Sequence, residues 1–301
     1  MAEILVATRD GLHRFDVSGR LLKVEFAGRE VSTIAPEGWE LWAILDGTEV
    51  VHTAGVDWWF HVANLRGLRG NCMADTRAGV IVGTSDAHLY RIAGKGLERV
   101  SSFAGAPGRK EWFTPWGGPP DTRSISEDGD TVYVNVHVGG VLKSSDHGES
   151  WQPTIEIEAD IHRVTTGHGR VYAAGADGLS VSQDQGSTWT SSNGGLRGSY
   201  CRSVTVCGDT VLVSAADGPR GGHSAIYRSD VEGRSFERST QGVPEWFKPN
   251  IDSLCLDAFP DGSLAAFGTQ DGRLFASTDK GESWSEIARG LPEVTRVQLI
   301  R

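Results

Sequence analysis

The sequence lacks any long hydrophobic run, contains few cysteines and has fewer basic than acidic residues. No apolar stretch in the 301 residues approaches the roughly 20 that a membrane-spanning helix needs. A formal net charge of −10 argues against nucleic acid or an anionic membrane as the main partner. The four cysteines form no C-x-x-C pair and no regular spacing, so we expect reduced, mostly buried thiols at Cys72, Cys201, Cys207 and Cys255.

The beginning of the chain also lacks the marks of a secretory leader. Residues 2–8 enter a strand-like pattern directly, without a basic segment or a cleavage site. We therefore expect a cytoplasmic protein. No stretch shows a helical period, whereas short alternating apolar runs between glycine-rich turns predict an all-β protein.

An eight-residue pattern, S-x-D-x-G-x-S/T-W, recurs in the C-terminal part of the chain. It occupies residues 144–151, 182–189 and 277–284. A degenerate copy at 229–236 keeps the glycine, the serine and an aromatic residue but has the aspartate one position earlier. The aromatic ends of the four copies lie 38, 47 and 48 residues apart. Intervals of this size are typical of propellers and other repeat proteins.

The chemistry of this pattern indicates a structural role. The aspartate can accept hydrogen bonds from the backbone of a tight turn, and the glycine takes a positive φ. The hydroxyl adds a second local hydrogen bond, and the tryptophan buries its ring between sheets. We assign this structural role to Asp146, Asp184, Asp279, Trp151, Trp189 and Trp284.

These copies resemble the Asp-box (BNR) repeats of sialidases, sortilin-type receptors and photosystem II assembly-factor-like proteins. The resemblance covers the repeat scaffold and names no reaction. It implies that the boxes lie on turns between the third and fourth strands of each blade, on the face away from the ligand.

The whole chain, 1–301, is predicted to form a single seven-bladed β-propeller. Six units show a strand, an Asp-Gly-like turn and a further strand, and a seventh without a box is placed at about 37–65. The alternating tail at 294–300 has no blade after it. We expect it to pair with the N-terminal blade and close the ring, which removes an exposed sheet edge.

One column of the predicted inner strands gathers ionisable side chains. Alignment of four successive blades places Arg123, His162, Arg202 and Asp252 at the same position. Two residues earlier the chain has polar residues again, among them Asp160 and Tyr200. Such side chains would converge on the mouth of the central channel, and His137, which ends a second strand, should point to the same face. A wet channel with polar walls and no function is the alternative.

The predicted roles follow from the chemistry of these groups. Arg123 and Arg202 suit a carboxylate, sulfate or phosphate. His162 and His137 could transfer protons, with Asp252, Asp160 or Tyr200 assisting. We expect a small anionic or carbohydrate-like ligand, and a hydrolase or lyase acting on it. A non-catalytic propeller that binds a protein or a ligand on its loop face is the alternative.

Two further features belong to this hypothesis. Near-identical segments place Trp112 and Trp246 before inner strands, where they could wall a sugar pocket or instead cap the gap between blades. A divalent metal on His52, His137 and His162 is an open alternative without a supporting motif. The resemblance to sialidases gives little support for sialidase catalysis, because no third arginine and no arginine-isoleucine-proline motif is evident.

Overall fold

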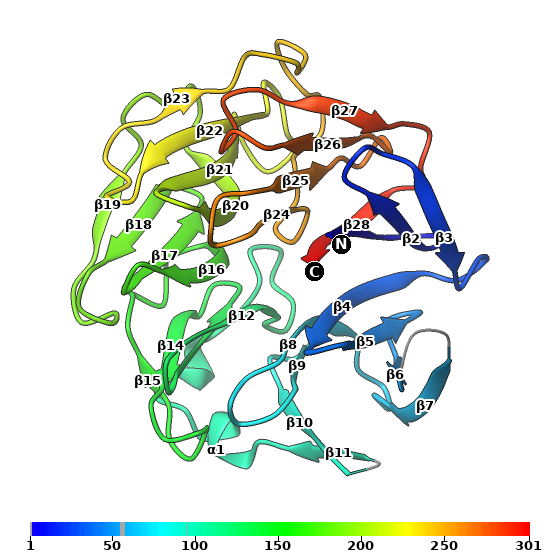
Figure 1. The fold of residues 1–301 in the computed structure, drawn as a ribbon. Coiled ribbons are helices and arrows are strands. Elements are labelled where there is room, and N and C mark those ends of the chain that lie inside the picture. The colour runs from blue at the N-terminus through cyan, green and yellow to red at the C-terminus, as the bar shows by residue number, and fades with distance from the viewer. Residues whose placement is uncertain (1, 55–57, 95) are drawn as a thin grey trace.

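The computed structural model describes residues 2–54, 58–94 and 96–301. They form seven four-stranded antiparallel sheets arranged as blades around a central axis (Figure 1). The prediction of a seven-bladed β-propeller is therefore confirmed. In these residues, no helix is long and apolar enough to cross a membrane.

Each blade runs from an inner strand at the axis to an outer strand at the rim. Blades 1 to 3 are β28 (Val294–Ile300), β1 (Glu3–Thr8), β2 (Gly11–Asp16), β3 (Leu21–Glu25); β4 (Val31–Glu37), β5 (Glu40–Leu45), β6 (Glu49–Thr53), β7 (Trp59–Asn64); and β8 (Gly70–Ala74), β9 (Ile81–Thr84), β10 (Leu89–Ala93), β11 (Gly96–Arg99). Blades 4 and 5 are β12 (Thr122–Asp128), β13 (Thr131–Val136), β14 (Gly140–Ser144), β15 (Gln152–Pro153); and β16 (Ile161–Gly167), β17 (Arg170–Gly175), β18 (Gly178–Ser182), β19 (Thr190–Ser192). Blades 6 and 7 are β20 (Tyr200–Cys207), β21 (Thr210–Ala216), β22 (Ala225–Asp230), β23 (Glu237–Arg238); and β24 (Leu256–Ala258), β25 (Ala265–Gly268), β26 (Leu274–Ser277), β27 (Ser285–Ala288).

The ring closes as the alternating tail predicts. The C-terminal strand β28 pairs antiparallel with β1, with Val297 opposite Val6, and the two termini meet near the axis (Figure 1). Blade 1 is therefore built from both ends of the chain. This pairing uses hydrogen-bonding groups that would otherwise form an open edge.

Two expectations need correction. The box-less blade begins at Val31, because its inner strand β4 precedes the predicted start at residue 37. The absence of helix is also not complete: the connection between blades 3 and 4 holds the short α1 (Ser101–Ala104) and the 3₁₀ turn η1 (Arg109–Glu111). Both are too short for a helical period to appear in the sequence.

The three full boxes form the same hydrogen-bonded turn between the third and fourth strands. In the first, Asp146 Oδ1 accepts from the Ser150 amide at 2.9 Å and from Ser144 Oγ at 2.7 Å, and Oδ2 accepts from Ser150 Oγ at 2.6 Å. Asp184 and Asp279 accept the equivalent bonds. The glycine has a positive φ, as expected, and so does the residue before it, at 57° in all three turns.

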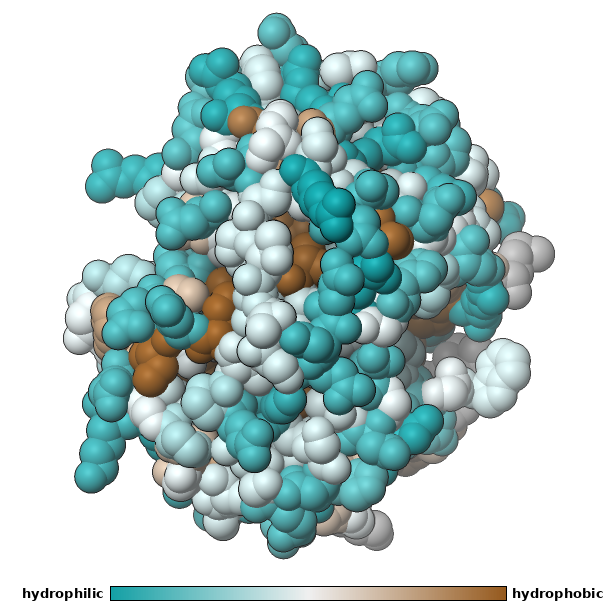
Figure 2. Space-filling model, turned by 90° about the vertical axis from the view of Figure 1, so that its left-hand side faces the viewer, coloured by the Kyte–Doolittle hydropathy of each residue, from teal (hydrophilic) through white to brown (hydrophobic). Residues whose placement is uncertain are grey.

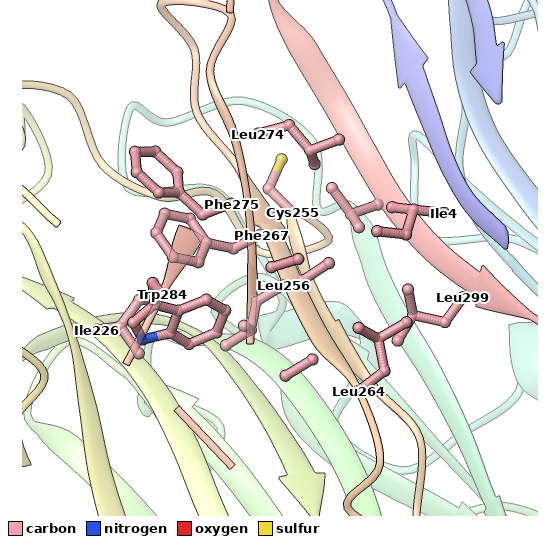
Figure 3. Close-up of a cluster of buried hydrophobic side chains, with 14 of the residues drawn as sticks. Ile4, Ile226, Cys255, Leu256, Leu264, Phe267, Leu274, Phe275, Trp284 and Leu299 are labelled. Atoms are coloured by element: carbon pink, nitrogen blue, oxygen red, sulfur yellow. The ribbon is translucent and has the colours of Figure 1, made fainter. Parts of the chain in front are cut away.

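Hydrophobic side chains fill the spaces between neighbouring blades. Figure 3 shows one such cluster, in which Phe267 and Phe275 stack with ring centroids 4.8 Å apart and Trp284 packs edge-on against Phe267. Ile226 of blade 6 and Leu299 of blade 1 complete it. The outer surface is mainly hydrophilic, as the view in Figure 2 shows, with hydrophobic residues visible in gaps. All four cysteines are buried and unpaired, as predicted.

Candidate functional site at the channel mouth

The predicted column of polar residues exists, and a repeated backbone feature creates it. In β12, Thr122 pairs with Val136 and Ser124 with Asn135, so that Arg123 is an extra residue in a β-bulge. Bulges redirect a side chain away from the regular alternation of a strand. Six inner strands carry one near their start, at Thr295, Ser32, Asn71, Arg123, His162 and Arg202.

Asp252 takes the seventh place in a different way. It was predicted on an inner strand, but the structure places it in the turn that precedes β24. The sequence alignment still found the right position, because the turn replaces the bulge at the start of that blade. Residues Ser32, Asn71 and Thr295 were missed; aligning β4, β8 and β28 with the other inner strands would have found them.

Five of these seven residues surround a cavity of about 350 Å³ at the mouth of the channel, whereas His162 and Arg202 do not line it. We call the face that holds it the loop face; the three eight-residue box turns that follow β14, β18 and β26 lie on the opposite, turn face. Arg123 and Asp252 line the cavity together with Ser32, Asn71 and Thr295. Its remaining polar walls are Arg9, Glu30, Arg69, Asp121, Ser253 and Glu293. The cavity therefore offers paired charges of both signs to a small polar molecule.

Behind Arg123 lies a row of buried polar groups. Arg123 Nη2 donates to His137 Nδ1 at 2.8 Å. Because that nitrogen accepts, the ring proton of a neutral His137 is on Nε2, which faces Asp160 Oδ1 at 2.9 Å. On the other side of Asp160, His162 Nε2 is 3.3 Å from the same oxygen. His162 Nδ1 donates to the carbonyl of Cys201 at 2.6 Å, since a carbonyl can only accept.

Burial separates the members of this His137–Asp160–His162 cluster. The side chains of His162 and His137 are 0% and 3% exposed, whereas that of Asp160 is 23% exposed. Burial would raise the pKa of Asp160, but the imidazoles of His137 and His162 lower it well below its usual range. Burial also lowers the pKa of His137. Asp160 is thus the ionised, solvent-reachable member, and neither histidine can touch a ligand in this conformation.

The other predicted residues form a second group beside the first. Arg202 Nε donates to Asp252 Oδ1 at 3.0 Å, and the Arg202 guanidinium lies 5.9 Å from the ring of Tyr200. The Tyr200 ring lies 4.6 Å from that of His162. Burial opposes ionisation of Asp252, yet the charge of Arg202 lowers its pKa below the usual range. Burial, followed by the charge of Arg202, lowers the pKa of Arg123, so the two guanidinium groups influence each other.

The two predicted tryptophans, Trp112 and Trp246, do not lie beside the cluster. Trp112 is 6% exposed and packs on Phe103 between blades 3 and 4, which favours the structural alternative for this residue. Trp246 lies among Arg197, Arg238 and His223 and is not part of the cluster. The tryptophan beside the cluster is Trp116, 68% exposed and 5.2 Å from His137.

His52 lies away from the other two histidines. It is near the end of β6 on the turn face, stacks on Trp42 at 4.0 Å and has Nε2 2.8 Å from Glu40 Oε2. Among the described residues, its ligating atoms group with those of Glu37 and Glu40. A metal shared by His52, His137 and His162 is therefore inconsistent with this arrangement.

Comparisons with known proteins identify the fold. No protein-family model matches the chain, and no curated protein matches it. A protein from Lactobacillus plantarum is similar over 100% of both chains, with 13% identity and a TM-score of 0.68. A GH74 xyloglucanase from Xanthomonas campestris matches 95% of this chain with 17% identity and a TM-score of 0.69. The match spans only 52% of that enzyme's chain.

A third neighbour differs in kind. YCF48 bound to D1 peptide matches over 88% of this chain and 93% of its own, with 13% identity and a TM-score of 0.57. At such identities these likenesses show a β-propeller shared with both an enzyme and a peptide-bound protein. The choice between those roles rests on the site itself.

Proposed function

We propose that this propeller binds a small anionic or sugar-like molecule in the channel-mouth cavity and acts on it as a hydrolase or lyase. The observation that carries the proposal is the position of Arg123. Its guanidinium lines the cavity and also contacts His137, the first member of the buried cluster. Binding and reactive groups are thereby joined in one hydrogen-bonded row.

The cavity suits an anion, and an exposed aromatic ring lies outside its lining, beside His137. Arg123 presents a planar cation that can bind carboxylate, sulfate or phosphate oxygens. The exposed ring of Trp116 beside His137 can stack on a sugar. Asp160, ionised and partly exposed, is the group of the cluster that solvent reaches. Two nearly fully buried histidines and a carboxylate are costly to gather, which favours a functional cluster over a merely wet channel.

The test is a binding screen on metal-free protein in a chelating buffer, followed by a turnover assay with and without added divalent metal ions. Wild type and Arg123→Met are compared by thermal shift with sulfate, phosphate, sialic acid, simple carboxylates and neutral sugars. Ligand binding raises the melting temperature by mass action. Arg170→Met is the matched control, because Arg170 pairs with Glu232 away from the channel mouth.

We expect an anion in the panel to stabilise wild type and Arg170→Met, and Arg123→Met to bind it at least about ten-fold more weakly. NMR of the bound compound class then detects hydrolysis or elimination. Equal binding by Arg123→Met, or no stabilisation by any anion, would contradict the proposed site.

One observation favours the non-catalytic alternative. Trp116 and Phe113 are 68% and 44% exposed on the connection between blades 3 and 4, where a protein partner could cover them. If no small molecule stabilises wild type, and immobilised wild type retains a defined protein that Trp116→Ser does not, the propeller is a binding scaffold.

A further inference from the structure

Three buried ligand atoms converge on one point in the cluster without forming regular hydrogen bonds. His137 Nε2, Asp160 Oδ1 and His162 Nε2 lie within 4.8 Å of one another. All three are inaccessible to solvent, and none has a hydrogen-bond partner of acceptable geometry, although two of the distances are short. Buried polar atoms are normally satisfied, so three unsatisfied atoms around one point require an explanation.

The two short distances from Asp160 are close to those between neighbouring ligands of a tetrahedral metal ion. Zinc binds imidazole nitrogen at about 2.0–2.1 Å and carboxylate oxygen at about 2.0–2.2 Å, which places neighbouring ligand atoms about 3.3 Å apart. The observed separations from Asp160 Oδ1 are 2.9 Å to His137 and 3.3 Å to His162. Lone pairs directed at a shared ion do not point at one another, which accounts for the poor hydrogen-bond angles.

The surroundings of His162 fit a metal ligand. Its Nδ1 donates to the Cys201 carbonyl, and a hydrogen bond of this kind fixes the tautomer of a ligating histidine. That contact leaves Nε2 with a free lone pair in the neutral ring. The ring is fully buried and packed against Tyr200, so its orientation is held before any ion arrives.

We propose that His137, Asp160 and His162 bind a divalent transition-metal ion of the zinc class. Two imidazoles and one carboxylate leave a fourth position free, as in catalytic rather than structural zinc sites. Asp160 is the partly exposed member, and it lines a second hollow with Gly175 and Ala176 rather than the channel-mouth cavity, so the open position lies on that side. This inference deepens the proposed function, since Arg123 joins His137 to the channel-mouth cavity, but it is measured without any substrate.

The position of Arg123 makes a further consequence testable. An ion on His137 Nε2 moves the ring proton to Nδ1, where Arg123 can no longer donate. Arg123 already has an unpartnered Nε and lines the cavity, so its guanidinium is released towards a ligand there. Metal and anion should therefore each tighten the binding of the other, because such coupling is reciprocal.

The molecule supplies an internal control on the opposite face. Glu37, Glu40 and His52 also bring three ligand atoms within 4.8 Å. Their atoms are already paired, however: His52 contacts Glu40 at 2.8 Å, and Trp42 Nε1 donates to Glu37 at 2.6 Å. Imidazole and carboxylate groups are thus present in both a satisfied and an unsatisfied arrangement.

The experiment titrates zinc into the chelator-stripped full chain by calorimetry, with cobalt as a spectroscopic probe of coordination. Wild type is compared with Asp160→Asn, His162→Gln and the control His52→Ala, and circular dichroism checks that each variant is folded. Asp160→Asn preserves the size of the side chain, so it remains informative if the histidine variant fails to fold.

We expect one zinc per chain in wild type and His52→Ala, and binding weaker by more than about 100-fold in Asp160→Asn. Tetrahedral cobalt absorption should be lost with it. No binding in wild type, binding unchanged in Asp160→Asn, or binding lost only in His52→Ala would overturn the proposal. The anion screen is run without metal, so the two proposals can fail separately. Anion binding without zinc binding would contradict the metal site alone. Zinc binding without anion binding would contradict the proposed anionic ligand alone.

Discussion

The two faces of the propeller use the same residue types in opposite ways. On the turn face, Asp146 has both carboxylate oxygens filled by donors within its own eight-residue box. On the loop face, Asp160 has an oxygen between two histidines from neighbouring blades, and no acceptable hydrogen bond reaches it. The first arrangement recurs three times and is complete in itself; the second is incomplete and joins two histidines to one carboxylate. Complete, repeated polar groups hold the fold, whereas the incomplete group indicates a ligand.

The largest effect is expected when a tryptophan of a box on the turn face is removed. Trp284 is 3% exposed and packs on Phe267, so Trp284→Ala should lower the free energy of unfolding by about 3–5 kcal/mol. Urea unfolding measures the loss. Anion and zinc binding by the fraction that remains folded should be unchanged, because the turn face is structural; a specific loss of either would break the comparison.

A smaller effect is expected from an arginine inside the channel. Arg163 Nη1 donates to Ser203 Oγ at 3.0 Å and to the carbonyls of Ser253 and Leu256 at 2.9 and 2.6 Å, joining blade 5 to blades 6 and 7. Burial lowers its pKa to about 10. Arg163→Met removes these three hydrogen bonds and should cost about 2–3 kcal/mol in urea unfolding.

This variant sharpens the comparison, because it separates position in the channel from function. Arg163 is next to His162 in the chain, yet its hydrogen bonds are satisfied as those of a structural residue are. Arg163→Met should bind zinc like wild type. Arg170→Met should change neither zinc binding nor the free energy of unfolding. If Arg163→Met lost zinc binding but kept its stability, a residue with satisfied hydrogen bonds would have a role in the site, and satisfied hydrogen bonds would not identify structural residues in this channel.

The sequence predicted what depends on short-range pattern. The boxes could be read because all bonds of Asp146 lie within Ser144–Ser150, and the closing strand Val294–Ile300 could be read from its alternation. Strand β4 was missed in part because the bulge at Ser32 interrupts that alternation. The column of Arg123, His162 and Arg202 was found because the repeat aligns it.

The chemistry of the site was less predictable. Nothing local shows that His137 from blade 4 meets Asp160, which lies between blades 4 and 5, or that His162 is completely buried. Trp112 and Trp116 stand four residues apart on one connection, but only the fold decides that the first enters the core and the second flanks the cluster. Contacts between blades depend on the curvature of the ring, which no short segment encodes.

The smallest effect concerns the boxes themselves and their dependence on pH. The hydroxyl and amide of Ser150 hold the pKa of Asp146 at about 2, and those of Thr188 do the same for Asp184. A carboxyl group with a folded-state pKa below its unfolded value of about 3.9 stabilises the fold fully above that value, and loses this contribution as pH falls towards 2. The double variant Asp146→Ala/Asp184→Ala should therefore melt a few degrees below wild type at pH 7. The gap should narrow between about pH 4 and pH 2 in calorimetric scans, and a gap that widened on acidification would show that the box carboxylates do not stabilise the turn face as ions.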